Sequence, residues 1–252
     1  MSRIHVLLLV CACHSAAPQP QGPPDQLPAG ARGSVLQHHA NASRDGVYTD
    51  PALTRAAARG LRQDLAFSAA LQGPVDAQPL YWDGGDGEQD LLLVFTERNE
   101  AIAFDPISGR RIWSRVVAAP VPRNTLPCGV IDPVGITGTP IIDAAAQTVH
   151  LVAMTTPDGG ASKRHLLYSL SLRDGSDARA PIDIQANVGG FDSALHNERG
   201  ALALVGGRVF VPFAGTWGTA AITGVGSSAS TLPARSPCSR SRRGFAEAGS
   251  GG

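Results

Sequence analysis

Between residues 78 and 117 the chain alternates hydrophobic and polar positions in short runs that are interrupted by turn-forming residues. An alternation of period two predicts half-buried β-strands, and clusters of Gly, Pro, Asn and Asp mark the turns between them. The turns here carry the sequences GGDG, ERNE and DPISG. The pattern therefore predicts four strands, at residues 79–82, 90–96, 101–105 and 111–117.

The same pattern returns twice. The second copy predicts strands at residues 140–143, 148–155 and 165–172, with a weaker fourth near 182–184. In the third copy two strands flank Gly206-Gly207, which suits a hairpin turn. The copies start at Pro79, Pro140 and Ala201, at intervals of 61 residues. Repeats of four short antiparallel strands are typical of β-propeller blades. We therefore expect an all-β fold over residues 35–215, a partial β-propeller of about two and a half blades, each a four-stranded antiparallel sheet.

Helical periodicity is confined to the stretch ALTRAAARGL. Asp50 can cap the free N–H groups of a short helix there, and Pro51 suits its first turn. Gly60 is expected to end it.

Composition agrees with a turn-rich β architecture, because 29 Gly and 19 Pro occur among 252 residues. Lys and Arg together number 21 and are balanced by 21 Asp and Glu, so no global field favours nucleic acid or an anionic membrane. We expect no nucleic-acid partner, despite a local arginine cluster near the C-terminus.

Residues 1–16 resemble an export signal, with Arg3 before an apolar run from Ile4 to Val10 that is too short to span a bilayer. Cys13 follows a lipoprotein-like cleavage box and is the candidate for lipidation, while ordinary cleavage near Ala16 is the alternative. Residues 17–34 are rich in Pro, Gln and Gly and predict a disordered tether. The protein is thus expected in the periplasm, at the cell surface or secreted, with membrane contact only through a lipid anchor.

The stretch AFDPISGRRIW, residues 103–113, resembles the A-x-D-x-x-T-G-x-x-x-W element of pyrroloquinoline-quinone-type propeller repeats. LYSLSLRDG, residues 167–175, is its counterpart in the next blade, without the tryptophan. In this element Asp and Gly form the turn between the outer strands, and Trp packs between neighbouring blades. Residues 35–215 are similar to bacterial PQQ-binding-like β-propeller repeat proteins, notably in VFTERNEAIAFD, CGVIDPVGITGTPIID and LHNERGALAL.

This resemblance implies a fold rather than a reaction. Quinone-dependent alcohol dehydrogenases of related fold use adjacent cysteines, a calcium site and a catalytic Asp, whereas this sequence has no Cys-Cys pair and no recognisable calcium set. We expect a non-catalytic binding or scaffold module for a protein or glycan, without a cofactor, a metal or catalytic residues in this chain. The alternative is an N-terminal fragment of a dehydrogenase that uses pyrroloquinoline quinone with calcium and whose active-site blades are missing.

From Thr216 the sequence becomes rich in Gly, Ala and Ser and then in Arg. The resemblance implies a continuation such as H-x-G-D-C-G. Plausible GC-rich codons for residues 215 onward, read from the last base of the glycine codon, give HLGDCGDYRGWVV. We therefore expect a one-base deletion near Gly215 and an out-of-frame, disordered tail over residues 216–252. The chain as given would then be a non-functional fragment with open blade faces that favour aggregation. A genuine flexible Gly/Ser-rich end is the alternative.

Three groups of polar residues are candidates for function. The stretch His196-Asn197-Glu198-Arg199 enters the third blade near the expected central channel. Its candidates His196, Asn197 and Arg199 would bind a ligand there or form hydrogen bonds to neighbouring blades. A second group would hold a ligand or metal, or merely pack a loop; it comprises His38, His39, Asn41 and Arg44. Glu97 and Arg98 lie in a predicted hairpin turn and are expected to be solvated.

Cys128 is the only cysteine within the folded pattern. It is interpreted as a buried thiol or as one half of a disulfide whose partner is missing from this chain.

Overall fold

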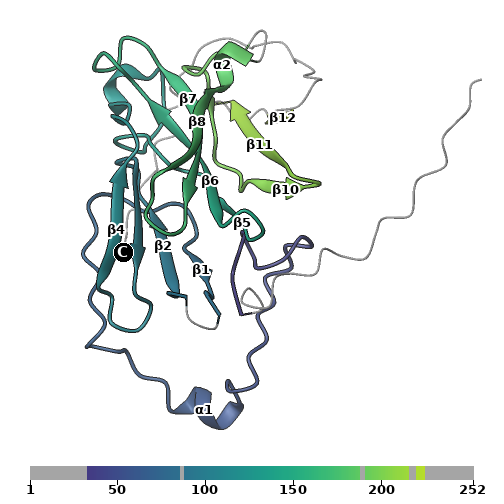
Figure 1. Ribbon diagram of the computed structural model, residues 1–252. Coiled ribbons are helices and arrows are strands. Elements are labelled where there is room, and N and C mark those ends of the chain that lie inside the picture. The colour runs from purple at the N-terminus through teal and green to yellow at the C-terminus, as the bar shows by residue number, and fades with distance from the viewer. Residues whose placement is uncertain (1–32, 86–87, 188–190, 216–219, 225–252) are drawn as a thin grey trace, which may run out of the picture.

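The computed structural model describes residues 33–85, 88–187, 191–215 and 220–224. These residues form three antiparallel sheets of four strands each, and the three sheets follow one another along the chain (Figure 1). The all-β fold of blade-like sheets confirms the fold class expected from the sequence.

Blade 1 follows the predicted strands closely. It consists of β1 (Leu80–Trp82), β2 (Leu91–Phe95), β3 (Glu100–Phe104) and β4 (Arg111–Val116), paired in that order. Alternate residues of β1 and β2 pack toward blade 2, since Leu80 and Leu93 lie opposite each other and both are fully buried.

Blade 2 repeats this order with β5 (Ile141–Asp143), β6 (Thr148–Thr155), β7 (Arg164–Ser171) and β8 (Asp177–Asp183). The fourth strand is longer than the sequence predicted, because it begins at Asp177 rather than near residue 182. As the outer strand it is exposed along most of its length, so it has little apolar alternation, and it tolerates Pro181.

Blade 3 contains β9 (His196–Asn197), β10 (Ala203–Val205), β11 (Arg208–Gly215) and β12 (Ala220–Gly224). The predicted hairpin is present: Gly206 and Gly207 form its turn, with φ of 55° and 71°. The two-residue strand β9 was not predicted and pairs with the end of β11. β12 falls within the segment assigned to the tail and pairs with β11, while the remaining residues of that segment lie outside the described ones.

The blades are joined by two apolar cores. The larger core, between blades 1 and 2, includes Trp82, Phe95, Trp113, Leu151 and Leu170. The smaller one lies between blades 2 and 3 and includes Ile141, Val152, Leu202, Val211 and Phe213. Trp113 therefore packs between neighbouring blades, as its motif predicted.

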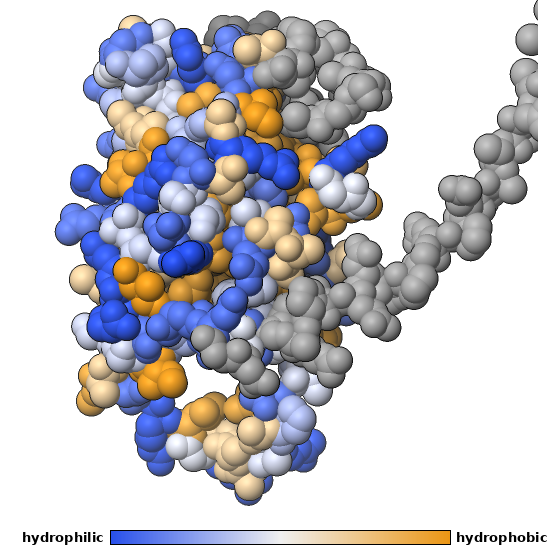
Figure 2. Space-filling view, viewed as in Figure 1, coloured by the Kyte–Doolittle hydropathy of each residue, from blue (hydrophilic) through white to orange (hydrophobic). Residues whose placement is uncertain are grey.

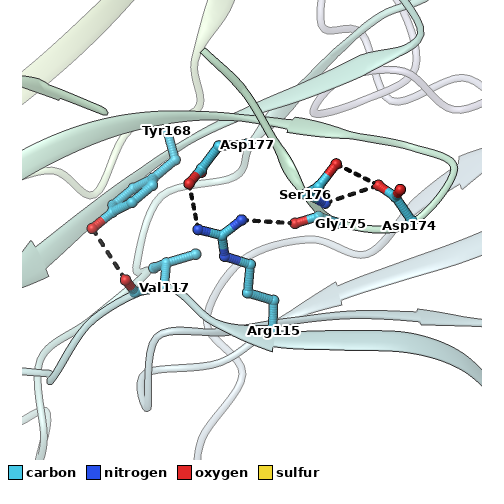
Figure 3. Close-up of polar contacts among 7 residues, drawn as sticks. All are labelled: Arg115, Val117, Tyr168, Asp174, Gly175, Ser176 and Asp177. Atoms are coloured by element: carbon cyan, nitrogen blue, oxygen red, sulfur yellow. Dashed lines mark hydrogen bonds and ion pairs between the residues drawn. The ribbon is translucent and has the colours of Figure 1, made fainter. Parts of the chain in front are cut away.

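A polar seam continues this contact at the outer strands (Figure 3). The Arg115 guanidinium on β4 donates a 3.2 Å hydrogen bond to the carbonyl oxygen of Gly175 and forms an ion pair with Asp177 of β8. The Tyr168 hydroxyl on β7 donates back across the seam to the carbonyl oxygen of Val117, at 3.3 Å. The two blades are therefore held by directional contacts as well as by the core.

The helical elements are short. Helix α1 (Arg55–Arg59) is capped by the Thr54 hydroxyl, which accepts a hydrogen bond from Ala57 N, and Gly60 ends it as predicted. The expected cap, Asp50, instead accepts from Ala52 N and shapes the turn before the helix. Helix α2 (Ile184–Asn187) and the 3₁₀ turn η2 (Arg123–Thr125) were not predicted, since three or four residues are too few to show a period.

Residues 47–71, here called the arm, run past α1 away from the sheets and carry many exposed apolar side chains (Figures 1 and 2). Helix α1 itself has no buried residue. The exposed apolar residues of the arm are Val47, Tyr48, Leu53, Leu61, Leu65 and Leu71. Among the described residues no helix has the length and apolar character that a membrane span requires.

Candidate functional site

The three predicted channel residues lie together just before blade 3. His196 and Asn197 form β9, both half-buried, while Arg199 is exposed. The His196 ring stacks on Phe191 with centroids 4.9 Å apart, and its Nδ1 lies 2.7 Å from the carbonyl oxygen of Asp192. The structure therefore gives His196 local contacts and leaves the Arg199 side chain in solvent.

Glu198, between these residues, is 2% exposed and packs against the backbone of Gly138 in the loop before blade 2. Burial raises the pKa of Glu198 well above its ordinary value. The Gly138 N–H partly opposes this shift, and the nearby Glu97 carboxyl adds to it. Neither oxygen of Glu198 has a donor in good hydrogen-bond geometry among the described residues. The protonated acid is thus the form that this site favours.

Glu97 was expected to be solvated, and this expectation is wrong, since the residue is 0% exposed. The Glu97 Oε2 atom accepts hydrogen bonds from Gly135 N at 2.6 Å and from Thr137 Oγ1 at 3.2 Å. The β2–β3 turn packs against the loop between β4 and β5, and this contact directs the Glu97 side chain inward. Arg98, the next residue, points into solvent as expected.

Burial raises the pKa of Glu97 to about 7. The Gly135 N–H lowers it, and a hydrogen bond with the Asp76 carboxyl raises it again. With a pKa of about 7, a large fraction of the Glu97 carboxyl is protonated at neutral pH.

Asp76, Thr137 and Glu198 occupy equivalent positions of the three repeats, since they lie at intervals of 61 residues. Together with Glu97 they form what we call the acid cluster. Adjacent blades are also tied at this level, because Gln78 N donates to Thr139 Oγ1 at 3.0 Å and Leu202 N donates to the carbonyl oxygen of Thr139 at 3.0 Å. The repeat thus brings one polar side chain from each blade to the same end of the sheets.

Glu198 lay in the stretch predicted to enter the channel, but the cluster as a set was missed because the predictions did not bring its members together. The signal that could have found it is the recurrence of polar residues, 61 apart, just before the first strand of each blade. A second missed residue is His165 on β7, which is fully buried among Phe191 and Phe213. Burial lowers the pKa of His165 to about 3, so its ring is neutral at physiological pH.

The N-terminal group of predicted residues lies on a segment that crosses the starts of all three blades. Val35 forms an antiparallel bridge with Tyr81 of blade 1, and the carbonyl oxygen of Leu36 accepts from Ile142 N of blade 2 at 2.8 Å. The Arg44 guanidinium donates to the carbonyl oxygen of Leu202, just before β10, at 2.9 Å. We call residues 35–44 the strap.

The remaining contacts of this group are internal to the strap or support it. The rings of His38 and His39 stack with centroids 3.9 Å apart, and His39 Nδ1 lies 3.0 Å from the carbonyl oxygen of Arg44. The Asn41 side chain accepts from Ser43 Oγ and Arg44 N. These contacts support the packing interpretation of the group, in which the polar side chains shape a loop.

Cys128 is half-buried in the loop between β4 and β5. The other cysteines, including the lipidation candidate Cys13, lie outside the described residues, so the disulfide and lipid predictions stay predictions. Within the described part of the chain, no group of three or more His, Cys, Asp or Glu side chains is arranged to hold a metal ion.

A comparison with known protein families and with curated proteins found no match to this chain. The likeness to pyrroloquinoline-quinone-type repeats therefore remains an expectation from the sequence motifs.

Proposed function

We propose that this chain belongs to an exported β-propeller that acts as a non-catalytic binding or scaffold module, with the acid-cluster end of the blades as its binding face. The partner is a protein or a glycan that carries acidic groups.

The observation that supports this proposal is the presence of two Glu-Arg pairs at that end, one in the β2–β3 turn and one after β9. Glu97 and Glu198 are buried, and the residues that follow them, Arg98 and Arg199, are exposed. The buried acids fix the two loops against neighbouring blades, so the exposed arginines project from a rigid base. Arginine recognises carboxylate and sulfate groups through planar paired hydrogen bonds, which favours an acidic partner.

Binding of the full chain to an immobilised polyuronate, with neutral dextran as reference, tests the proposal. Salt-sensitive binding to the polyuronate is expected, and the double variant Arg98→Gln/Arg199→Gln should weaken it about tenfold. The control pair Arg110→Gln/Arg208→Gln removes two exposed arginines at the opposite end of the blades and should bind as the parent does. An equal loss of polyuronate binding in both double variants would show that binding depends only on overall charge. It would contradict the proposed binding face.

The dehydrogenase alternative predicts a different outcome. Uptake of pyrroloquinoline quinone with calcium by the frame-restored protein, seen as a new absorption band, would favour an enzyme. Lack of uptake together with polyuronate binding would favour the module.

Export rests on residues 1–16 and is tested separately. Expressed with this segment in a bacterium, the chain should fractionate with membranes, and Cys13→Ala should release it into the soluble fraction. Membrane association that survives Cys13→Ala would contradict lipidation at this residue.

A further inference from the structure

The structure contains a pocket at the opposite end of the blades from the acid cluster, between blades 1 and 2. Its volume is about 350 Å³, which lies within the size range of small-molecule sites. The pocket is lined by the turns β1–β2 and β5–β6, by the turn after β7 and by the start of β4. It shares no residue with the acid cluster, so binding in this pocket is independent of the proposed function.

The walls of the pocket are apolar. Trp82 and Leu91 pair directly across β1 and β2, and Leu172 of blade 2 faces them from the other side. Ile112 of β4 completes this lining. Trp82, Leu91 and Leu172 are each at most 5% exposed and belong to the larger core, so the walls are already formed without a ligand.

The polar rim offers one unused charge. Glu88 accepts a hydrogen bond from Gln147 Nε2 at 3.0 Å, which closes the rim between the blades. Gln89 donates to the carbonyl oxygen of Asp90. The Arg173 guanidinium, in contrast, has no hydrogen bond or ion pair to any described residue. Its charge helps to lower the pKa of the adjacent Asp174, but that carboxylate accepts its hydrogen bonds from Ser176.

We propose that this pocket binds a small organic monoanion, a single carboxylate on an aromatic or branched aliphatic body. The apolar walls take the body and Arg173 pairs with the carboxylate. Glu88 at the same rim disfavours a second negative charge on the ligand. The Trp82 ring is too covered to offer the open face on which a sugar stacks, so the site favours an acid over a carbohydrate.

Benzoate is the probe, and its binding to the full chain is followed by NMR through the indole N–H of Trp82, assigned with Trp82→Phe. A Kd of roughly 1 mM is expected for a ligand of this size. Benzyl alcohol, which keeps the ring without the charge, should bind at least about tenfold more weakly.

Arg173→Gln should weaken benzoate binding about tenfold and leave that of benzyl alcohol unchanged. Arg164→Gln, which alters an exposed arginine on the other end of blade 2, is the matched control and should change neither. Ile112→Phe, designed to fill the pocket, should abolish both without altering the far-ultraviolet circular dichroism of the chain. No shift of the Trp82 resonance at ten times the expected Kd, or equal affinity for the two probes, would overturn the proposal.

Discussion

The indole Nε1 of Trp113 in blade 1 donates a 2.9 Å hydrogen bond to the carbonyl oxygen of Leu172 in blade 2. The ring lies directly on Gly175, where an added Cβ would come within 2.7 Å of Trp113 Cε3. One motif residue thus supplies both apolar burial and a buried polar contact to the next blade. The packing of blade 1 against blade 2 therefore depends on this side chain in two ways.

Replacement of Trp113 should separate these two contributions. Trp113→Phe keeps most of the apolar area but leaves the Leu172 carbonyl without its donor, and should lower the free energy of unfolding by about 1–3 kcal/mol. Trp113→Ala also leaves a cavity and should cost about 3–5 kcal/mol. Urea denaturation of the chain measures both. Ile107→Ala, at a site 83% exposed, is the control with little expected change. A Trp113→Phe variant as stable as the parent would show that the hydrogen bond contributes nothing.

Two glycines with the same backbone conformation offer a matched test of the seam. Gly175 and Gly207 both have φ of 71°, but a Cβ at Gly207 would meet nothing within 4 Å. Gly207→Ala should therefore cost only the left-handed backbone penalty of about 1 kcal/mol. Gly175→Ala adds a clash with Trp113 and should lower the melting temperature clearly more. Equal effects of the two changes would mean that the Trp113 ring moves aside freely.

The sequence predicted blade 1 almost strand by strand because its inner strands alternate and its turns carry Gly, Asp and Asn at the required positions. It also predicted the inter-blade position of Trp113. It failed at β8, which is an exposed outer strand, and at β9, which has two residues. Such elements are defined by the strands they pair with, so their own sequence carries little signal.

The acid cluster illustrates a second limit. A glutamate in a hairpin turn is usually solvated, and nothing local to Glu97 indicates otherwise. Its burial arises from Gly135, 38 residues away, which places a backbone N–H against the carboxylate. Only the 61-residue repeat, which aligns Asp76, Thr137 and Glu198, connects these positions in the sequence.

Stability should depend on pH through Glu97. Its pKa is about 7 in the folded protein against an ordinary value of 4.5, so the folded state binds this proton more tightly than the unfolded state does. The resulting stabilisation is fully present below pH 4.5 and is lost as the pH rises through about 7, with a magnitude of about 1–3 kcal/mol. Glu97→Gln mimics the protonated acid, and should be more stable than the parent at about pH 8.

The comparison of parent and variant isolates the effect of the Glu97 carboxyl, together with its influence on the pKa of Glu198, from that of His165. His165 acts in the opposite direction, because its lowered pKa makes stability fall as the pH drops below its ordinary value of 6.5. His165 is present in both proteins, so its contribution cancels in the difference between their free energies of unfolding. Glu88→Gln, at an exposed glutamate, is the control, and its difference from the parent should stay flat across the same pH range. An equally flat difference for Glu97→Gln would contradict the buried proton.

The strap should couple the N-terminal residues to blade 3 through Arg44. Its guanidinium donates to the carbonyl oxygens of Leu202 and Ala201, at 2.9 and 3.3 Å, and a shorter amide side chain cannot reach both. Arg44→Gln should therefore speed amide hydrogen exchange at Leu202 and in β10, by about tenfold for a loss of about 1.4 kcal/mol in local opening. Exchange in β2 and β3, with which the strap forms no backbone hydrogen bond among the described residues, is the internal control. Arg44→Lys should not restore protection fully, because the lysine side chain is one bond shorter than the reach of Arg44 Nη2, the atom that donates to both carbonyl oxygens. Uniformly faster exchange in all three blades would mean instead that Arg44 supports the whole fold rather than the attachment of blade 3.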